Sequence, residues 1–329
     1  MIFIFLSAGF FLGWILGRNN LSNLFGAAVG TRMIRLSTAA TLACIFLTLG
    51  AFTGGAGTTS ALIQLAPLQT PVDAAIITVS AALVLLLATA NSIPVSIAQT
   101  TLGALIGWIL FEQAALDMWT VYRIAWAWSI SPFLIAGFSF LGMIGIRRLS
   151  SRHPMPVLWR DFGTRVGLVV SGCFAAYALG ANNISTIAAP YLMTLPAVPP
   201  ALIWALTCLA VCAGCWTADK NVIRTVTSRL FPLSPIEACV ACTTMAVTLL
   251  LFSSIALRTF FIQTLHIYVP VIPLPSSILL VGATVGIALA KGGYGLNMMT
   301  LLKMVASWIL IPVTTGLICY LILTILSVR

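Results

Sequence analysis

The sequence predicts an all-α polytopic membrane protein, and two observations carry this prediction. Hydrophobic residues make up 60% of the 329 residues and charged residues only 7%, whereas a soluble domain has a charged fraction of about 25%. Uncharged runs of about 20 residues, the length that crosses a bilayer as a helix, recur along the chain. A soluble globular protein is therefore excluded.

The chain is also strongly basic. It has 16 Lys and Arg against 6 Asp and Glu, which gives a net charge of +10. Because most of these cations flank apolar runs, they are interpreted as determinants of membrane orientation rather than as a nucleic-acid site. We therefore expect a multi-pass protein of the cell (inner or plasma) membrane that contacts the lipid bilayer and has no nucleic-acid partner.

The first half, residues 1–146, is predicted to form one membrane repeat. Its spans are expected at residues 2–16, 36–53, 74–91 and 119–146. The first span is expected to end at Gly17, followed by a shorter amphipathic piece up to Gly30. Residues 50–59 are interpreted as a flexible, glycine-rich exit from the second span. Pro94 and the polar residues after it predict a re-entrant hairpin, followed by a partial span at 103–111.

A basic stretch at residues 147–165 is predicted to be a cytoplasmic linker between the two halves. The second half, residues 166–329, forms the second predicted membrane repeat, with spans expected at 166–182, 200–217, 238–257 and 302–326. Helix breaks are expected at residues 180–186 (GANNIST), at Pro190, and at residues 271–286, where proline and serine occur together again.

Ordered matches between the halves indicate a duplicated unit. The motif Asn19-Asn20-Leu21-Ser22 corresponds to Asn182-Asn183-Ile184-Ser185, and the pattern GAxxG occurs at 103–107 and 282–286. Further matches keep one constant offset: Arg123, Trp128 and Pro132 correspond to Lys303, Trp308 and Pro312. Duplicated membrane units of this kind are often related by inverted topology, with broken helices meeting near the midplane. The N-termini of such half-helices present free N–H groups and suit an oxyanion.

At these residues the chain resembles the inorganic phosphate transporter (PiT) family. The family signature G-A-N-D-V-A-N-A, present once per half, is similar to GANNIST with the Ile-Ala-Ala-Pro that follows it and, in the first half, to GRNNLSNLFGAAVGT. The family motif P-V-S-T-T-H is similar to residues 94–99 and, more loosely, to 273–278. The W-x-x-S-P element recurs at 128–132, and residues 220–226 resemble another family segment.

The resemblance implies an inverted-repeat secondary transporter, a symporter that carries a tetrahedral oxyanion. It implies that the Asp residues of the motif hold the driving cation, Na⁺ or H⁺, while amides and hydroxyls contact the anion. The substrate-binding candidates are Arg18, Asn19, Asn20, Ser22, Asn23, Ser96, Gln99, Thr100, Asn182, Asn183, Ser185, Thr186, Ser276 and Ser277.

The departures from the family pattern bear on coupling. Both signature aspartates are asparagine, Asn20 and Asn183, and Arg18 stands where the family has a small residue. An amide oxygen still ligates Na⁺, so weak Na⁺ binding at Asn20 and Asn183 is expected, but without the anionic charge that holds a hard cation. Whether Na⁺ or H⁺ drives transport therefore stays open. Arg18 either pairs with the oxyanion or extends to an interface or a helix C-terminus.

The predicted function is transport of inorganic phosphate, bound at the midplane between the two repeats. Sulfate transport, an uncoupled oxyanion channel or exchanger, and a non-transporting sensor are the alternatives. An enzyme is not expected, because six carboxylates and two histidines give no pair at catalytic spacing. No cofactor is expected, Glu237 is the first carboxylate to test for a coupling proton, and the oligomeric state, including a homo-oligomer, stays open.

Overall fold

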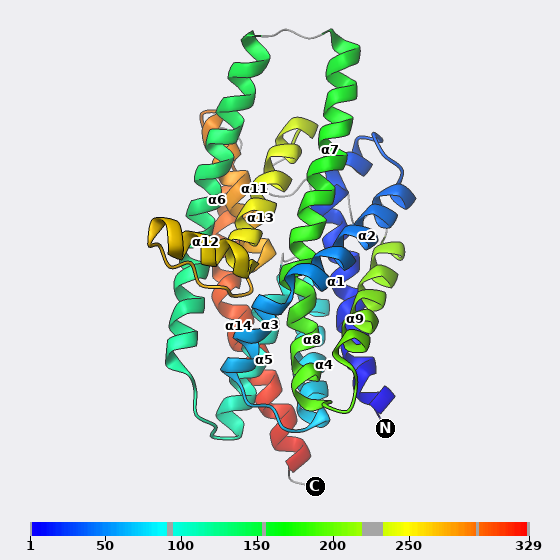
Figure 1. Cartoon of the computed structure of the whole chain (residues 1–329), viewed down its shortest axis with the longest axis vertical. Helices are drawn as coiled ribbons and strands as arrows, with labels where there is room; N and C mark the ends of the chain where they lie inside the picture. The colour runs from blue at the N-terminus through cyan, green and yellow to red at the C-terminus, as the bar shows by residue number, and fades with distance from the viewer. Residues whose placement is uncertain (1, 91–94, 153–155, 219–232, 294–295, 328–329) are drawn as a thin grey trace.

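The computed structural model describes residues 2–90, 95–152, 156–218, 233–293 and 296–327, and every regular element in these ranges is helical. The elements of the first half are α1 (Ile2–Gly30), α2 (Leu36–Gly54), α3 (Ala56–Leu65), α4 (Pro71–Ala90), α5 (Ile97–Phe111) and α6 (Met118–Arg152). Those of the second half are α7 (Val157–Leu179), a π-helical turn (Gly180–Ile184), α8 (Ser185–Thr194), α9 (Pro200–Trp216), α11 (Pro235–Ser253), α12 (Ile255–Leu265), α13 (Ser276–Ala290) and α14 (Met298–Ser327). They form an elongated bundle (Figure 1).

The bundle is built to lie in a membrane. Within the described ranges, six helical segments are long and apolar enough to cross a bilayer. Large apolar side chains are exposed on the outer faces of the long helices α6 and α14, for example Phe133 and Ile309. Since water would penalise such surfaces and acyl chains do not, these faces are suited to contact with lipid. The structure thus confirms an all-helical, multi-pass membrane protein.

The two halves pack on each other reciprocally. Helix α5 packs along α14, and α13 packs along α6. A Cβ atom added at Gly103 of α5 would collide with the carbonyl of Pro312 in α14, and one added at Gly282 of α13 would meet the carbonyl of Pro132 in α6. The GAxxG motif of each half therefore lies against the proline of the other half, as small residues at close helix crossings do. The predicted duplication is consistent with this exchange, and its inverted topology stays a prediction.

Two predicted interruptions of the first half are wrong. Helix α1 continues without a break from Ile2 to Gly30, through Gly17 and the two asparagines after it. Gly17 is a contact glycine: a Cβ there would collide with the backbone of Val211 in α9. Residues 50–59, expected to be a flexible exit, instead form the end of α2 and the start of α3. Glycine in these helices permits close approach rather than ending the helix.

The second half corrects two further expectations. Pro190 lies inside α8 and does not end it. Most of the basic stretch 147–165 is helical, because α6 extends to Arg152 and α7 begins at Val157. By length and rise per residue, α6 is about 52 Å long and exceeds a hydrocarbon core of about 30 Å. The expected family segment at 220–226 and Pro94 lie outside the described residues.

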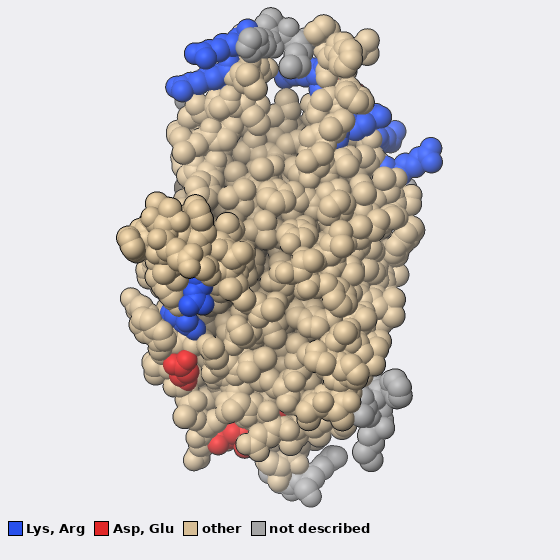
Figure 2. Space-filling model, viewed as in Figure 1, with Lys and Arg blue, Asp and Glu red and all other residues tan. Residues whose placement is uncertain are grey.

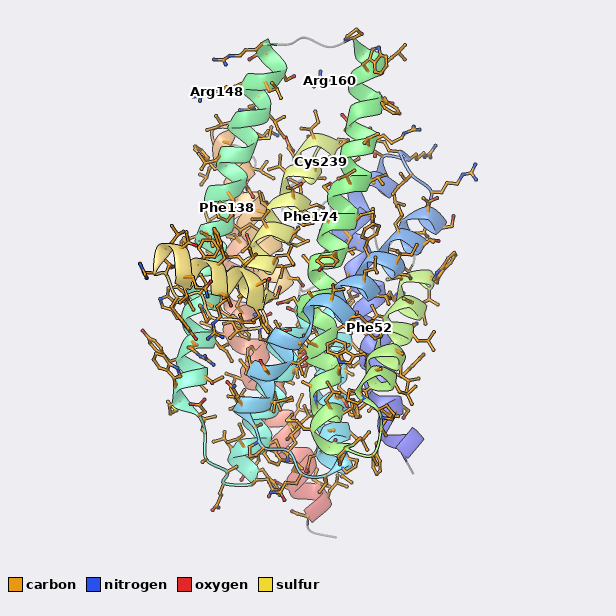
Figure 3. The ribbon with its side chains drawn as sticks, viewed as in Figure 1. Phe52, Phe138, Arg148, Arg160, Phe174 and Cys239 are labelled. Atoms are coloured by element: carbon orange, nitrogen blue, oxygen red, sulfur yellow. The ribbon has the colours of Figure 1, made fainter. Side chains whose placement is uncertain are left out.

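Charge divides the molecule into two ends. Basic side chains gather at the end where α6 and α7 approach each other, and acidic side chains on the visible face lie toward the opposite end (Figure 2). Arg148 of α6 and Arg160 of α7 extend from the basic end, as Figure 3 shows. If the positive-inside rule holds for this chain, the basic end faces the cytoplasm.

Candidate functional site

The second copy of the asparagine motif is a π-helical turn inside an otherwise continuous helix. Residues Gly180–Ile184 form the π-turn, which joins α7 to α8, and all five residues are buried. A Cβ at Gly180 would collide with the backbone of Leu47, so this residue allows α2 to pack directly on the turn. A π-turn rotates the side chains that follow it relative to an α-helix and is frequent at functional sites.

Asn182 is fixed by a two-way hydrogen bond with the segment that leads into α13. Its Nδ2 donates to the carbonyl oxygen of Leu274 at 2.8 Å, and its Oδ1 accepts from the Leu274 N–H at 2.9 Å. Since Leu274 offers one donor and one acceptor, the amide of Asn182 has only one satisfactory orientation. The π-turn thereby holds the backbone two residues before α13.

The orientation of Asn182 determines what Asn183 presents. Nδ2 of Asn182 also donates to Oδ1 of Asn183 at 2.7 Å. The oxygen of Asn183 is thus an acceptor for its neighbour, and its Nδ2 group is left buried without a partner among the described residues. At the position where the family signature has an aspartate, this site presents N–H groups instead of a carboxylate.

The hydroxyl groups after the asparagines tie the π-turn to α3. The Thr58 and Ser185 hydroxyls are 2.6 Å apart, and Thr58 also donates to the carbonyl of Ala181 at 3.0 Å. Ser185 and Thr186 both donate to the carbonyl of Asn182, at 2.8 and 3.3 Å. Sequence reasoning missed Thr58 and Leu274. The glycine-rich pattern around Thr58 disguised a helix, and Leu274 contributes only its backbone.

The N-termini of the two short helices α5 and α13 meet in the interior. Oε1 of Gln99 accepts from the Ser96 N–H at 3.4 Å and lies 3.5 Å from the hydroxyl of Ser277. Gln99 Nε2 and Ser96 Oγ are buried without a partner in the described part of the chain. Ser276, the first residue of α13, is also buried, whereas the hydroxyl of Thr100 is used within α5 by the carbonyl of Ile97. Two helix N-termini thus direct partial positive charge into one region.

The first copy of the motif is held differently. Asn19 donates from Nδ2 to the hydroxyl of Thr89 at 2.9 Å, close to the C-terminal end of α4. Asn20 Nδ2 and Ser22 Oγ are buried, and neither has a partner within the described ranges. Asn23 is half-buried. As in the second copy, the first asparagine is anchored and the second presents an unpaired amide group.

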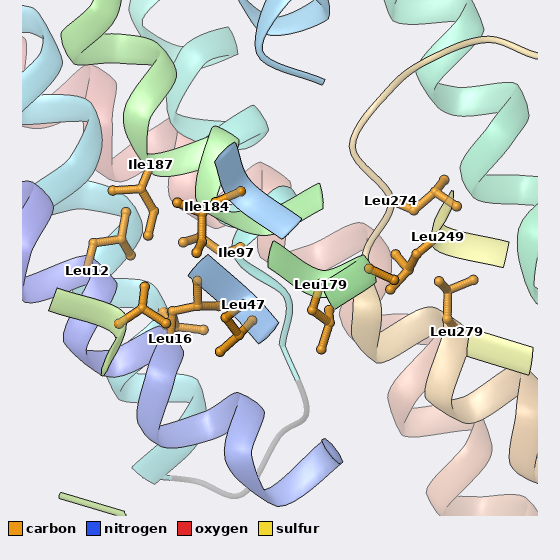
Figure 4. Packing of buried hydrophobic residues seen from close by; sticks show 14 of the residues in the cluster. Leu12, Leu16, Leu47, Ile97, Leu179, Ile184, Ile187, Leu249, Leu274 and Leu279 are labelled. Atoms are coloured by element: carbon orange, nitrogen blue, oxygen red, sulfur yellow. The ribbon is translucent and has the colours of Figure 1, made fainter. Parts of the chain in front are cut away.

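Core packing shows which way the first copy faces. Leu16, one helical turn before Asn20, belongs to the same apolar cluster as Ile97 of α5 and Ile184 of the π-turn, and the three side chains gather in Figure 4. Residues four apart lie on the same face of a helix, so Asn20 points toward the region that contains α5 and the π-turn.

Arg18 lies on another face of α1. It is two residues from Asn20, about 200° around the helix axis. Its guanidinium carbon is 5.7 Å from the ring centroid of Trp14, and the residue is half-buried. This placement favours the interpretation in which Arg18 packs at the periphery. Its pairing with an anion stays a prediction.

The candidate proton carrier Glu237 has a structural partner. Its Oε1 is 2.8 Å from Nζ of Lys291, the one ion pair within the described ranges. Its other oxygen accepts from the N–H of Ser234 at 2.9 Å and so caps the start of α11. The pair links the start of α11 to the end of α13. A role in proton coupling stays a prediction.

The chemistry of the buried centre is that of a hydrogen-bond donor set. The unpaired atoms are three amide nitrogens and two hydroxyls: Asn20 Nδ2, Asn183 Nδ2, Gln99 Nε2, Ser22 Oγ and Ser96 Oγ. A buried polar group without a partner costs about 1–3 kcal/mol, so a cluster of them indicates a ligand. Hydrogen bonds join Asn183 to Asn182 and α13, and join α13 to Gln99. The first motif copy reaches this centre through the packing of α1.

A wholly helical membrane bundle with such a centre is a membrane transporter rather than an enzyme. The chain belongs to the phosphate transporter family, whose model matches residues 16–258. It is 21% identical to a candidate phosphate permease of Methanocaldococcus jannaschii over 314 residues, which cover 95% of this chain and 94% of the relative. A second candidate phosphate permease, from Pyrococcus horikoshii, is 26% identical over 185 residues, or 52% of this chain and 46% of that protein.

A solved structure shows the same fold. The structure titled "The sodium-dependent phosphate transporter" has a TM-score of 0.82 and 20% sequence identity, and the match covers 99% of each chain. At this identity the likeness concerns the arrangement of the helices.

Proposed function

We propose that this protein moves inorganic phosphate across the membrane and binds it in the buried donor set between the two halves, near the bilayer midplane. Membership of the phosphate transporter family and the names of the relatives support phosphate as the substrate. The observation that carries the site is the set of buried, unpaired amide and hydroxyl donors on α1, α5 and the π-turn.

The proposed binding mode follows from charge. Phosphate accepts hydrogen bonds through its oxygens, and amide N–H and hydroxyl groups donate them. The N-termini of α5 and α13 add partial positive charge without any cationic side chain, which suits an anion that must be released after it has crossed. Strong pairing with a buried guanidinium would hold the anion more tightly.

The same geometry bears on the driving ion. The oxygen of Asn183 already accepts a hydrogen bond from Asn182, and the atom directed away from that bond is the Nδ2 donor. Na⁺ requires oxygen ligands, so Asn183 is a poor position for it. We infer that cation coupling, where it occurs, does not depend on Asn183. Sodium dependence is a property printed in the name of the structural relative.

One observation favours a second candidate substrate. The unpaired groups of the site include three amide nitrogens, which donate only, and no carboxylate. At neutral pH phosphate carries a proton that needs an acceptor, whereas sulfate carries none. A donor-rich site therefore also fits sulfate, and sulfate transport is retained as the alternative to phosphate.

Uptake into proteoliposomes tests both substrates and the driving ion. Labelled phosphate is added outside with unlabelled sulfate as competitor, with and without gradients of Na⁺ and H⁺. Saturable phosphate uptake that sulfate inhibits only weakly is expected under this proposal. Sulfate uptake that exceeds phosphate uptake would establish the alternative. Flux insensitive to both gradients would indicate an uncoupled pathway, and an absence of flux and binding would contradict transport itself.

A further inference from the structure

The second half contains an insertion between its long helix and its short helix. In the first half, residues 91–96 separate α4 from α5, whereas in the second half residues 254–275 separate α11 from α13. The insertion contains α12, which has no buried residue and projects from the flank of the bundle (Figure 1). The duplication therefore leaves this element without a counterpart of comparable length, and its role must be sought in its own residues.

Two arginines enclose one tyrosine where the insertion lies against α6. Arg123 donates from Nη1 to the hydroxyl of Tyr268 at 3.1 Å. The guanidinium carbon of Arg258 lies 5.3 Å from the centroid of the same ring. Both arginines are half-buried, and basic atoms are visible on this flank in Figure 2, apart from the basic end. Like charges near one ring repel each other unless a negative charge lies nearby.

The negative charge available from the protein is incomplete. Arg123 donates from Nη2 to the Thr120 hydroxyl at 3.1 Å, and that hydroxyl donates to the Asp117 carboxylate. The hydrogen bond from Thr120 holds the pKa of Asp117 below its usual value, so this carboxylate is ionised at neutral pH and offsets Arg123. Arg258 has no carboxylate partner among the described residues. The group Arg123, Arg258 and Asp117 thus keeps an excess of one positive charge.

Hydrogen-bond donors are also left over. Nε of Arg123 is buried and has no partner in the described ranges. The guanidinium of Arg258 contacts the ring of Tyr268 and forms no hydrogen bond within the same ranges, so its donors remain available. Guanidinium groups bind the oxygens of phosphate and sulfate in pairs, which makes an inorganic oxyanion the ligand that fits this group.

The segment after Tyr268 leads directly to the central site. Trp128, about one and a half turns after Arg123 on α6, donates from Nε1 to the carbonyl of Pro273 at 3.0 Å. The next residue, Leu274, is the one that Asn182 holds. Residues 268–274 therefore run beside α6 from the two arginines to the start of α13.

We propose that Arg123, Arg258 and Tyr268 form an outer binding site for an inorganic oxyanion, which captures the anion before it passes to the buried donor set. This inference rests on the proposed transport function. The site raises the local concentration of the anion near the segment that leads inward. It lies on the flank away from the basic end, so it serves the side of the membrane opposite that end.

Kinetics of phosphate uptake test the outer site. Arg258→Gln is the cleaner variant, because Arg258 makes a ring contact and no side-chain hydrogen bond. At low ionic strength we expect its KM for phosphate to rise about fivefold with kcat unchanged, and about 0.5 M salt should remove most of the difference through screening. Arg258→Lys should retain most of the affinity. Arg160→Gln, an equal change of charge at the basic end, is the matched control and should leave KM unchanged.

Chemical protection tests the site independently of transport. Phenylglyoxal modifies accessible arginines, and mass spectrometry of the full-length protein in detergent reports modification at each position. Inorganic phosphate should protect Arg258 at least threefold, while Arg160 should react equally with and without phosphate. The protection should persist in Asn182→Ala, in which the central site is disrupted.

The outcomes separate the two proposals. If wild-type protein transports phosphate while Arg258→Gln keeps the wild-type KM and phosphate fails to protect Arg258, the outer site is refuted and transport stands. If wild-type protein moves no phosphate and no sulfate, the proposed function fails. Protection of Arg258 in that case would still establish the outer anion site.

Discussion

The two copies of the asparagine motif share a sequence pattern but differ in backbone and in anchoring. The second copy is a π-turn in which three side-chain hydrogen bonds hold Asn182, two of them to Leu274. The first copy lies in the unbroken helix α1, and Asn19 makes one side-chain hydrogen bond, to Thr89. In both copies the following asparagine presents an unpaired Nδ2 group. The difference teaches that one side of the site is rigid and the other can adjust.

The largest expected difference comes from removing the anchors. Asn182→Ala leaves the N–H and C=O groups of Leu274 unpaired in the interior, at about 1–3 kcal/mol each, so uptake should fall about a hundredfold. Asn19→Ala removes one hydrogen bond, and the Thr89 hydroxyl keeps its bond to Leu85, so a loss of about fivefold is expected. Initial rates of uptake, corrected for the amount of protein in the vesicles, measure both. Equal losses would contradict the contrast between a rigid and an adjustable copy.

The next comparison restores the carboxylates of the family signature. Asn183→Asp keeps the acceptor for Asn182 but replaces the free N–H₂ group by a charged oxygen, which repels an oxyanion and attracts Na⁺. Uptake without sodium should fall about tenfold, and added Na⁺ should recover part of it. Asn20→Asp should act in the same direction. Asn183→Gln and Asn20→Gln control for changes of shape, and sodium-independent uptake in both Asp variants would refute this account.

A smaller effect is expected from the link between α3 and the π-turn. Thr58→Val removes the hydroxyl that contacts Ser185 and Ala181. The protein should lose about 1–2 kcal/mol of stability, and uptake should fall about threefold. Thr58→Ser keeps the hydroxyl and is the matched control. Thermal unfolding in detergent and initial uptake rates check the two effects, and a Val variant indistinguishable from the Ser variant would show that this link has no effect.

The smallest effect is expected at Arg18. Its side chain lies over Trp14 and projects from a different face of α1 than Asn20. Arg18→Ala should therefore change the KM for phosphate by less than about twofold, since such a contact contributes about 0.5–1 kcal/mol. Arg18→Lys serves as the control for charge. A tenfold rise of KM in the Ala variant alone would show that Arg18 pairs with the anion after all.

Hydropathy predicted most of the membrane spans, because apolar length is a property of the local sequence. The predicted spans 36–53, 74–91 and 200–217 correspond closely to α2, α4 and α9. The break at Gly17 was predicted wrongly because glycine has two meanings in a membrane. It can end a helix, or it can let another helix approach, and only the position of Val211 shows that it does the latter.

The candidate site was predictable as a set of residue types but not as a geometry. Adjacent asparagines in apolar surroundings indicated buried polar groups, and most of these residues are buried. Which amide atom stays unpaired depends on Leu274, whose contribution is backbone and therefore invisible in a sequence pattern. The outer arginines were missed for a similar reason, because Arg123 and Arg258 meet only through Tyr268.

The exchange of partners between the halves has a consequence for synthesis. Helix α5, which carries Gln99, packs against α14, the final helix of the described chain. Because a ribosome completes the first half long before α14 emerges, α5 must wait in the membrane with its glycine-lined face uncovered. The first half expressed alone should therefore be degraded rapidly, and co-expression of residues 156–329 should restore it. This transporter can complete its binding site only when its last helix has been inserted.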